Sequence, residues 1–269
     1  MNVTQDHVQE ISGDKPLSRK QPLQYRGIFL KRFPGLFARV PKGTFKHVAI
    51  PDGQSSFFRK FVDSFLTSMI REIPQKNVRV FDIGCGGGYV RGILAREGYS
   101  GTYTGLDIVF EDRFKNFETS AFVSTFIQSP IESFSPPDRF DVVISNTSLE
   151  HVESDTMAVK KAHELRAHGG IEIHIVPSWW SFFIYLWHGY RHYTPGSLKR
   201  LFSGTNYTVY KLGGLFSFIA QILLFTIPER YCKTSFRTKN WYPGLVRKIA
   251  VLDRYIPLCP VGYGIVVHE

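Results

Sequence analysis

The chain has 269 residues, of which 43% are hydrophobic and 15% aromatic, and its formal net charge is +10. This composition can bury a hydrophobic core and excludes a chain that is disordered throughout. The positive charge favours an acidic partner, such as an anionic membrane surface, nucleic acid or a phosphorylated substrate, although a basic solvated surface accounts for it equally well. The three cysteines are scattered without metal-ligand spacing, which favours a reduced, cytoplasmic setting.

Composition divides the chain into an arm and one large domain. Residues 1–54 are polar and basic, with an acidic start that does not resemble a signal peptide, and we expect an N-terminal arm or lid there. Residues 55–269 are predicted to form one α/β domain, within which residues 214–259 form an apolar and basic insertion. No apolar run reaches the ~20 residues needed to span a bilayer.

Segments that favour helix alternate with segments that favour strand along the domain. The helical spacing of apolar residues predicts a first helix over 56–73. Further helices are expected at 88–99, 155–170 and 194–204, the last with Pro195 near its start. The predicted strands are 78–83, 101–109, 121–127, 140–146, 171–178, 206–214 and 262–269. Strands separated by helices predict a mostly parallel sheet covered on both faces, a Rossmann-like three-layer α/β sandwich.

A glycine-rich turn follows the first predicted strand. Gly84, Gly86 and Gly88 lack Cβ atoms, so backbone and ligand can approach closely there. Strand, glycine-rich turn and helix together bring a nucleotide-like ligand to the carboxyl edge of the first strand. Tyr89 stands where the dinucleotide fingerprint needs its third glycine. Asp82, just before the turn, suits a cationic or hydroxyl-bearing ligand better than a pyrophosphate.

Asp107 ends the second predicted strand, about as far downstream as the ribose-binding acid of nucleotide folds requires. A carboxylate at that place can accept hydrogen bonds from both ribose hydroxyls. The alternative is a surface acid or a helix cap.

Several motifs, in this order, resemble the class I S-adenosylmethionine-dependent methyltransferases, especially the small-molecule branch that includes the quinone-biosynthesis methyltransferases. The motifs are VRVFDIGCGGG (78–88), TGLDI (104–108), FDVVISNTSLEHV (140–152), LRAHGGIEIHIVPS (165–178) and HYTPGSLKRLFSGTNYTVYKLGG (192–214). The resemblance covers roughly residues 55–213 and the last strand. It implies a seven-stranded, mostly parallel sheet with an antiparallel last strand, and S-adenosylmethionine as the cofactor.

The resemblance also implies a role for the residues of the first motif. Asp82 and the backbone at Gly84 and Gly86 would face the amino-acid part of the cofactor. Gly88 would start the helix beside it.

The later motifs are expected to hold the rest of the cofactor. Asp107 would bind the ribose, and Ile108 would pack on the adenine. The family often has an acid after the third strand to meet the adenine amino group, whereas this chain offers Ser129, with Ile131 and Glu132 nearby. Asn146 would lie near the reactive end of the cofactor.

The methyl group of a sulfonium is already activated, so the protein mainly aligns the nucleophile. A hydroxyl nucleophile benefits from a base. His151 is the candidate base, with Glu150 as the residue that would orient it; the alternative is a packing or helix-end histidine. One glutamate and one histidine do not make a metal site, so no metal is predicted. His188 and His192 are further candidates for the substrate cavity, and structural roles are favoured for both.

Acceptor choice is expected to lie outside the motifs. Residues 177–193 are dense in aromatic side chains, and residues 215–228 form a nearly unbroken apolar run followed by lysines and arginines. Such a run can lie in a membrane interface, or it can be a buried lid helix. We therefore expect a small-molecule or lipid-linked acceptor, methylated on oxygen. An anionic membrane surface is a partner that the residues leave open, so the expected location is cytoplasmic or peripheral at the inner face of a membrane.

Three other functions stay open on the sequence alone. An oxidoreductase with a dinucleotide cofactor is disfavoured by Tyr89 and Asp82. A cofactor-binding protein without catalysis is compatible with the intact glycines and Asp107. A nucleic-acid methyltransferase is suggested by the charge, but the Asn/Asp-Pro-Pro-aromatic motif usual in base-modifying members is absent after the fourth strand. Nucleic acid is therefore not expected as a partner.

Overall fold

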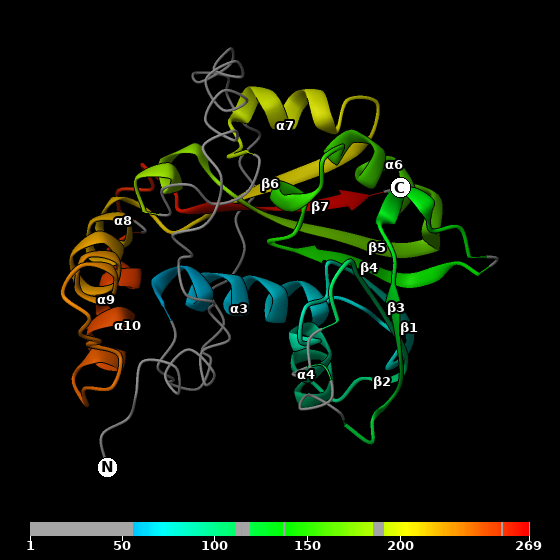
Figure 1. The fold of residues 1–269 in the computed structure, drawn as a ribbon, viewed down its shortest axis with the longest axis horizontal. Coiled ribbons are helices and arrows are strands. Elements are labelled where there is room, and N and C mark those ends of the chain that lie inside the picture. The colour runs from blue at the N-terminus through cyan, green and yellow to red at the C-terminus, as the bar shows by residue number, and fades with distance from the viewer. Residues whose placement is uncertain are drawn as a thin grey trace.

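The computed structural model describes residues 56–110, 114, 119–136, 138–184, 191–253 and 255–268. Its centre is one seven-stranded sheet with the strand order β3-β2-β1-β4-β5-β7-β6 (Figure 1). The predicted arm at 1–54 and the candidate His188 lie outside the described residues.

The strands pair as the sequence predicts. The pairs β1–β2, β2–β3, β1–β4 and β4–β5 are parallel, whereas β7 is antiparallel to both β5 and β6. The strand bounds are β1 (Asn77–Ile83), β2 (Ser100–Asp107), β3 (Phe122–Gln128), β4 (Phe140–Asn146), β5 (Arg166–Pro177), β6 (Asn206–Leu212) and β7 (Gly262–His268). The predicted mostly parallel sheet with an antiparallel last strand is confirmed.

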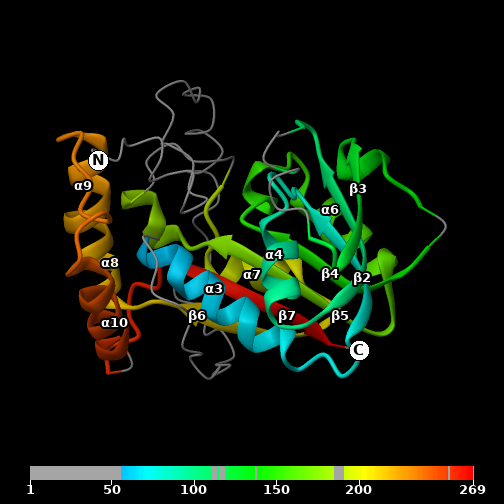
Figure 2. The same cartoon turned by 90° about the horizontal axis from the view of Figure 1, so that it is seen from below.

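Helices cover both faces of the sheet. On one face, α3 (Phe57–Ile70) and α4 (Tyr89–Arg96) share a buried core with the alternate residues of the strands. On the other face, α6 (Asp155–Leu165) and α7 (Pro195–Leu201) bury a second core. Figure 2 shows this three-layer arrangement from below. The short helices are η1 (Ile131–Ser133), η2 (Leu149–His151) and η3 (Trp179–Phe183).

The beginnings of the helices follow from local sequence signals. Ser56 caps α3 by accepting a hydrogen bond from the backbone N–H of Arg59. Thr194 and Ser197 form a capping box at α7, with Pro195 in its first turn, where a missing N–H costs nothing. The predicted position of Pro195 is confirmed.

The end of α6 differs from the prediction of a helix over 155–170. The helix ends at Leu165, and β5 begins at Arg166. Gly170 lies against main-chain oxygens, where a Cβ would come within 2.9 Å of the Ala167 oxygen, and Gly169 has a φ of +71°. The register against β4 also shifts here. The two glycines therefore allow an irregular start of a strand rather than the end of a helix.

Four helical segments lie between β6 and β7: α8 (Leu215–Gln221), the π-helix η4 (Ile222–Thr226), α9 (Ile227–Arg230) and α10 (Tyr242–Leu252). They stand together at one end of the molecule in both views (Figures 1 and 2). Ala220, Tyr242 and Val246 bury a small core with Phe57 at the start of α3. The insertion is thus packed onto the sandwich through its own apolar contacts.

Candidate active site

The site is expected where the strand order reverses. β1 lies between β2 on one side and β4 on the other, so the chain changes direction across the sheet here, and open α/β sheets bind their ligands at the carboxyl edge of such a switch point. The glycine turn after β1 and the turn after β4 meet at this place. Gly84 has a φ of +68°, and a Cβ on it would stand 2.3 Å from Cβ of Ser148. The Ser148 hydroxyl donates to the Ile83 carbonyl oxygen, at 2.6 Å.

Asp107 joins the glycine turn to the end of β2. Its Oδ2 accepts a hydrogen bond from the Gly86 N–H at 2.9 Å, and its carbonyl oxygen accepts one from the Ser129 N–H at 3.1 Å. Ile108, next along the chain, has 64% of its surface exposed. The structure therefore brings together Gly86, Asp107, Ile108 and Ser129, with a carboxylate beside an open apolar side chain.

Gly88 is the residue from which α4 starts. It is the N-cap of the helix and has a φ of +74°, in the left-handed region that favours glycine. A Cβ on it would approach the ring of Phe114 to 3.2 Å and the guanidinium of Arg91 to 3.3 Å. The glycine thus allows a tight path into the helix between two large side chains.

Asp82 is buried at the end of β1, with 1% of its surface exposed. Burial raises the pKa of its carboxyl to about 7, with a smaller rise from Asp107 and an opposing effect of a hydrogen bond from the Tyr103 hydroxyl. Its other oxygen, Oδ1, is enclosed and has no hydrogen-bond partner among the described residues. An enclosed acceptor oxygen below the glycine turn fits a ligand that carries N–H groups.

The turn after β4 holds the remaining predicted residues. Oδ1 of Asn146 is enclosed and has no hydrogen-bond partner among the residues that the structure describes. Thr147 has a φ of +54°, and its N–H donates to the Ile175 carbonyl oxygen at 2.9 Å. His151 follows in η2 and is exposed, with its own N–H donating to the Ser148 oxygen. The turn after β4 thus carries an exposed histidine three residues after Ser148, the residue that lies against Gly84.

Glu150 lies on the inner side of the same turn. Only 1% of its surface is exposed, and burial raises the pKa of its carboxyl to about 8, against the lowering effect of Arg191. The charged group that acts on the Glu150 carboxyl is therefore Arg191, whereas His151 lies on the surface. That Glu150 orients His151 stays a prediction.

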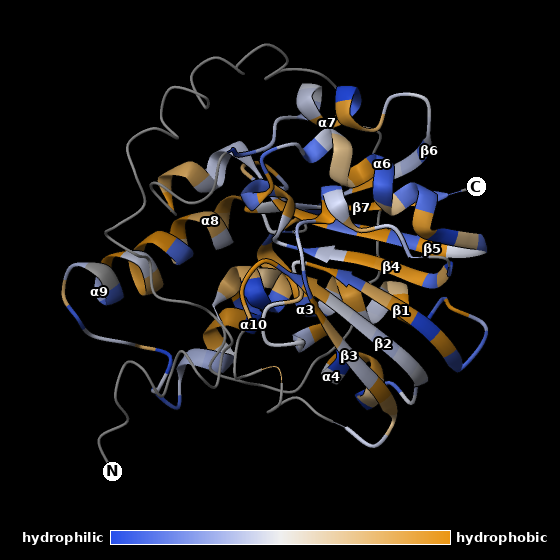
Figure 3. Ribbon diagram, turned by 45° about the vertical axis from the view of Figure 1, so that its right-hand side comes forward, coloured by the Kyte–Doolittle hydropathy of each residue, from blue (hydrophilic) through white to orange (hydrophobic). Residues whose placement is uncertain are grey.

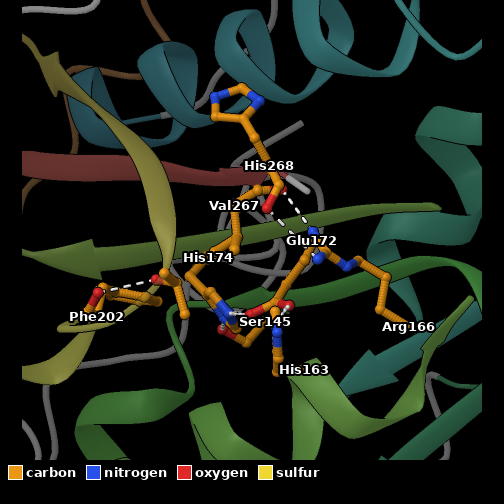
Figure 4. Close-up of polar contacts among 9 residues, drawn as sticks. Ser145, His163, Arg166, Glu172, His174, Phe202, Val267 and His268 are labelled. Carbon is orange, nitrogen blue, oxygen red and sulfur yellow. Dashed lines mark hydrogen bonds and ion pairs between the residues drawn. The ribbon is translucent and has the colours of Figure 1, made fainter. Parts of the chain in front are cut away.

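A hydrogen-bonded chain in β4 and β5 was missed by the sequence reasoning. Ser145 Oγ lies 2.7 Å from His174 Nδ1, and His174 Nε2 lies 2.8 Å from Glu172 Oε1 (Figure 4). Burial works to raise the pKa of Glu172, but its hydrogen bond and charge interaction with His174 outweigh this and lower the pKa. All three residues are fully buried, and the Ser145–His174 hydrogen bond ties β4 to β5. The sequence signal that could have revealed this chain is the pair Glu172 and His174, two polar residues two positions apart in a buried strand.

Aromatic residues gather in the segment after β5. The rings of Trp179 and Trp180 are 3.9 Å apart, and Trp180 packs edge-on against Phe218 of α8 at 6.0 Å. His192 is buried and packs edge-on against Phe182, also at 6.0 Å. Figure 3 shows the strongly apolar character of the neighbouring α8. The predicted aromatic segment and the apolar run therefore meet in space.

The described residues contain no group of three or more histidines, cysteines or acids placed to hold a metal ion. None of the helices in the described ranges has the length and apolar character that crossing a bilayer requires.

These residues fit S-adenosylmethionine in their chemistry. Asp82 and Asp107 offer carboxylate oxygens that suit its amino and hydroxyl groups, Ile108 offers an exposed apolar side chain that suits its base, and the glycines carry no Cβ that would stand in its way. The individual contacts stay predictions. The sheet order and the residues at its switch point are those of a nucleotide-binding α/β fold.

Comparison with known proteins leads to the same class. A family model described as "Methyltransferase domain" matches residues 55–212, more than half of the chain. The chain belongs to this family. Its fold is that of a class I S-adenosylmethionine-dependent methyltransferase: a solved S-adenosylmethionine-dependent methyltransferase from Archaeoglobus fulgidus superposes with a TM-score of 0.52 at 19% identity, over 80% of this chain and 96% of that one.

Curated relatives match a shorter stretch. The ubiquinone biosynthesis O-methyltransferase of Vibrio cholerae is 37% identical over 98 residues, and that of Yersinia pestis is 34% identical over 98 residues. Each match covers 34% of this chain and 39% of the relative's length. The predicted class, S-adenosylmethionine-dependent methyltransferase similar to quinone-biosynthesis enzymes, is confirmed.

Proposed function

We propose that the chain methylates a hydroxyl group of a small or lipid-linked acceptor. The observation that carries this proposal is His151, exposed at the carboxyl edge of β4 in a turn that packs directly on Gly84. Relatives over part of the chain are named O-methyltransferases, which supports oxygen as the methylated atom.

The chain's own residues supply binding and orientation. When bound, S-adenosylmethionine supplies an activated methyl group. Asp107 and Ile108 hold the ribose and adenine, and Asp82 with the glycine turn holds the amino-acid end. His151 accepts the proton of the acceptor hydroxyl, which raises the nucleophilicity of its oxygen.

The acceptor side favours a flat or apolar molecule. Trp180 of η3, in the segment after β5, contacts Phe218 of α8, and we propose that this aromatic surface forms the side of the site that receives the acceptor. Aromatic faces recognise flat rings by stacking. We propose a phenol or catechol as the acceptor class, with or without an apolar tail.

The helical insertion supports contact with an anionic membrane surface. Ile219, Leu223 and Ile227 are 45%, 55% and 39% exposed, and their spacing of four residues places them along one side of the α8–α9 helix. Exposed Lys233 and Lys239 follow in the loop after it. Apolar side chains next to cations suit a bilayer that carries negative headgroups.

Calorimetric titration with S-adenosylmethionine and S-adenosylhomocysteine, with NADH as the control, tests the cofactor. Transfer of a radiolabelled methyl group to 3,4-dihydroxybenzoate and to a geranyl-substituted catechol then tests the acceptor class. Transfer to the catechol oxygen supports the proposal. Cofactor binding without transfer to any phenol, amine or carbon acceptor would favour a binding protein without catalysis, and binding of NADH alone would overturn the function.

Co-sedimentation with vesicles tests the membrane contact separately. We expect binding to vesicles that contain phosphatidylglycerol, little binding to pure phosphatidylcholine, and a loss of binding in Leu223→Glu. Equal behaviour of the variant and the unaltered protein would remove this surface from the proposal, and concentration-dependent dimerisation without vesicle binding would assign it to a second copy of the chain.

A further inference from the structure

Arg191 lies directly behind the turn that carries His151. Its Nη1 donates to the carbonyl oxygen of Val152 at 2.7 Å and lies 3.4 Å from that of Leu149. Its Nη2 donates to the carbonyl oxygen of Glu153 at 2.6 Å. These three carbonyls flank His151 on both sides, so one planar guanidinium spans the whole turn.

The surroundings of the guanidinium make this contact rigid. Arg191 is 5% exposed, and its Nη1 lies 3.5 Å from Oδ2 of Asp155 in the first turn of α6. The Tyr193 hydroxyl donates to the same carboxylate oxygen at 3.2 Å. Buried charge-assisted hydrogen bonds of this kind are stronger than exposed ones and hold a single geometry.

The other end of the turn is fixed to the cofactor side. Ser148 donates to the Ile83 carbonyl oxygen next to Gly84, and the Thr147 N–H donates to the Ile175 carbonyl oxygen. Arg191 also belongs to the aromatic-rich segment 177–193, which follows β5. The turn is thus held between the glycine loop on one side and the acceptor-side segment on the other.

We propose that Arg191 is a positioning residue for methyl transfer: it fixes the turn of His151 and links that turn to the acceptor side of the site. The inference rests on the proposed function, since it concerns the residue proposed as the base. Arg191 itself acts only through the main chain of the turn. Displacement of a catalytic group by about 1 Å is enough to cost up to about a hundredfold in rate.

Arg191→Lys is the informative variant. Lysine keeps the positive charge beside Glu150 and Asp155, but its single ammonium nitrogen cannot take the places of both Nη1 and Nη2. Arg166→Lys is the matched control, since Arg166 also donates to two main-chain oxygens, those of Val267 and His268, but at the start of β5, away from the carboxyl edge.

Two readouts decide the proposal. Hydrogen exchange of the amides at 147–153 needs no acceptor; we expect faster exchange in Arg191→Lys, with exchange at 84–88 unchanged, and no change at either place in Arg166→Lys. With an acceptor that accepts methyl from the unaltered protein, we expect kcat to fall at least about tenfold while KM for S-adenosylmethionine stays within about twofold.

Each outcome has one meaning. Unchanged exchange at 147–153, or faster exchange with an unchanged kcat, overturns the positioning role. If the unaltered protein methylates none of the probes, the proposed function fails, and the exchange measurement still decides whether Arg191 fixes the turn. If Arg191→Lys does not fold, Tyr193→Phe removes only the hydroxyl that holds Asp155 beside Arg191, and the same expectations apply at smaller size.

Discussion

The Tyr103 hydroxyl donates a hydrogen bond to the buried carboxyl of Asp82, which joins β2 to β1 directly below the glycine turn. Burial has the largest effect on the pKa of this carboxyl and raises it to about 7. A carboxyl that binds its proton more tightly when folded stabilises the protein fully below its unfolded pKa of about 4, and this stabilisation is lost as the pH rises toward 7.

Asp82→Asn is therefore expected to flatten the dependence of stability on pH. Asparagine keeps the acceptor for Tyr103 and has no proton to lose. Between pH 4 and pH 7 the free energy of unfolding of the unaltered protein should fall relative to that of the variant, by at most about 4 kcal/mol, since one pKa unit corresponds to about 1.4 kcal/mol. Urea titrations at several pH values measure this; parallel curves for the two proteins would show that Asp82 ionises normally.

Gly84→Ala tests the contact between the two turns of the site. The new Cβ would stand 2.3 Å from Cβ of Ser148, and the residue would also have to adopt a φ of +68°. We expect a destabilisation of about 2–5 kcal/mol and weaker cofactor binding. Gly98→Ala is the control, because Gly98 has a φ of +79° with open space around it and should cost only about 1–2 kcal/mol. Equal losses in the two variants would contradict the close packing.

Asp107→Ala is expected to weaken binding of S-adenosylhomocysteine by roughly 1.5–3 kcal/mol, because a hydrogen bond to a charged group is lost. The change also removes the acceptor of the Gly86 N–H, so part of the effect reaches the ligand through the turn. Calorimetry measures the affinity, and Asp141→Ala, which alters an aspartate at the start of β4, is the control. An unchanged affinity would remove Asp107 from the site.

His151→Ala is expected to lower kcat by about 10²–10⁴-fold, the contribution of a general base, while the affinity for S-adenosylhomocysteine stays nearly unchanged. His151 is exposed, so its removal leaves the core intact. Single-turnover transfer to the catechol probe, together with calorimetry, separates the two effects. If kcat of His151→Ala equals that of the unaltered protein, the acceptor hydroxyl loses its proton without His151.

Arg237→Met tests how much the buried Arg237–Glu229 ion pair in the helical insertion contributes to the free energy of unfolding. Arg237 is 1% exposed and binds Glu229 through two hydrogen bonds of 2.7 and 2.9 Å. Removing it leaves a buried carboxylate without its cation, which typically costs 3–5 kcal/mol, about what we expect here. The control is Arg79→Met, which breaks a more exposed pair with Asp141 and should cost about 0–1 kcal/mol. Similar losses in both variants would show that the buried pair contributes no more than an exposed one.

Sequence periodicity could predict the sheet because its strands and helices alternate with clear breaks. The end of α6 could not be predicted, since Gly169 and Gly170 usually end a helix, but the register against β4 decides their conformation here. Local sequence was sufficient for Pro195, whose role depends only on its own helix.

The candidate site was predictable only where a motif carries its own chemistry. Asp107 and the glycines were expected from spacing, and the structure places them side by side. Arg191 could not be expected, because its partners lie about forty residues earlier and become neighbours only through the fold. The Ser145–His174 contact likewise depends on the alignment of two strands.

The position of β7 in the sheet has a consequence for folding while the chain is being synthesised. β7 lies between β5 and β6, and in the described sheet β6 pairs with β7 alone. During synthesis the parallel part from β3 to β5 can form first, while β6 and the helices after it have to wait for a strand made later. Gly262 and Gly264 of that strand pack against the rings of Phe58 and Phe65. The first described helix, α3, therefore gains these contacts of its core only when β7 is in place.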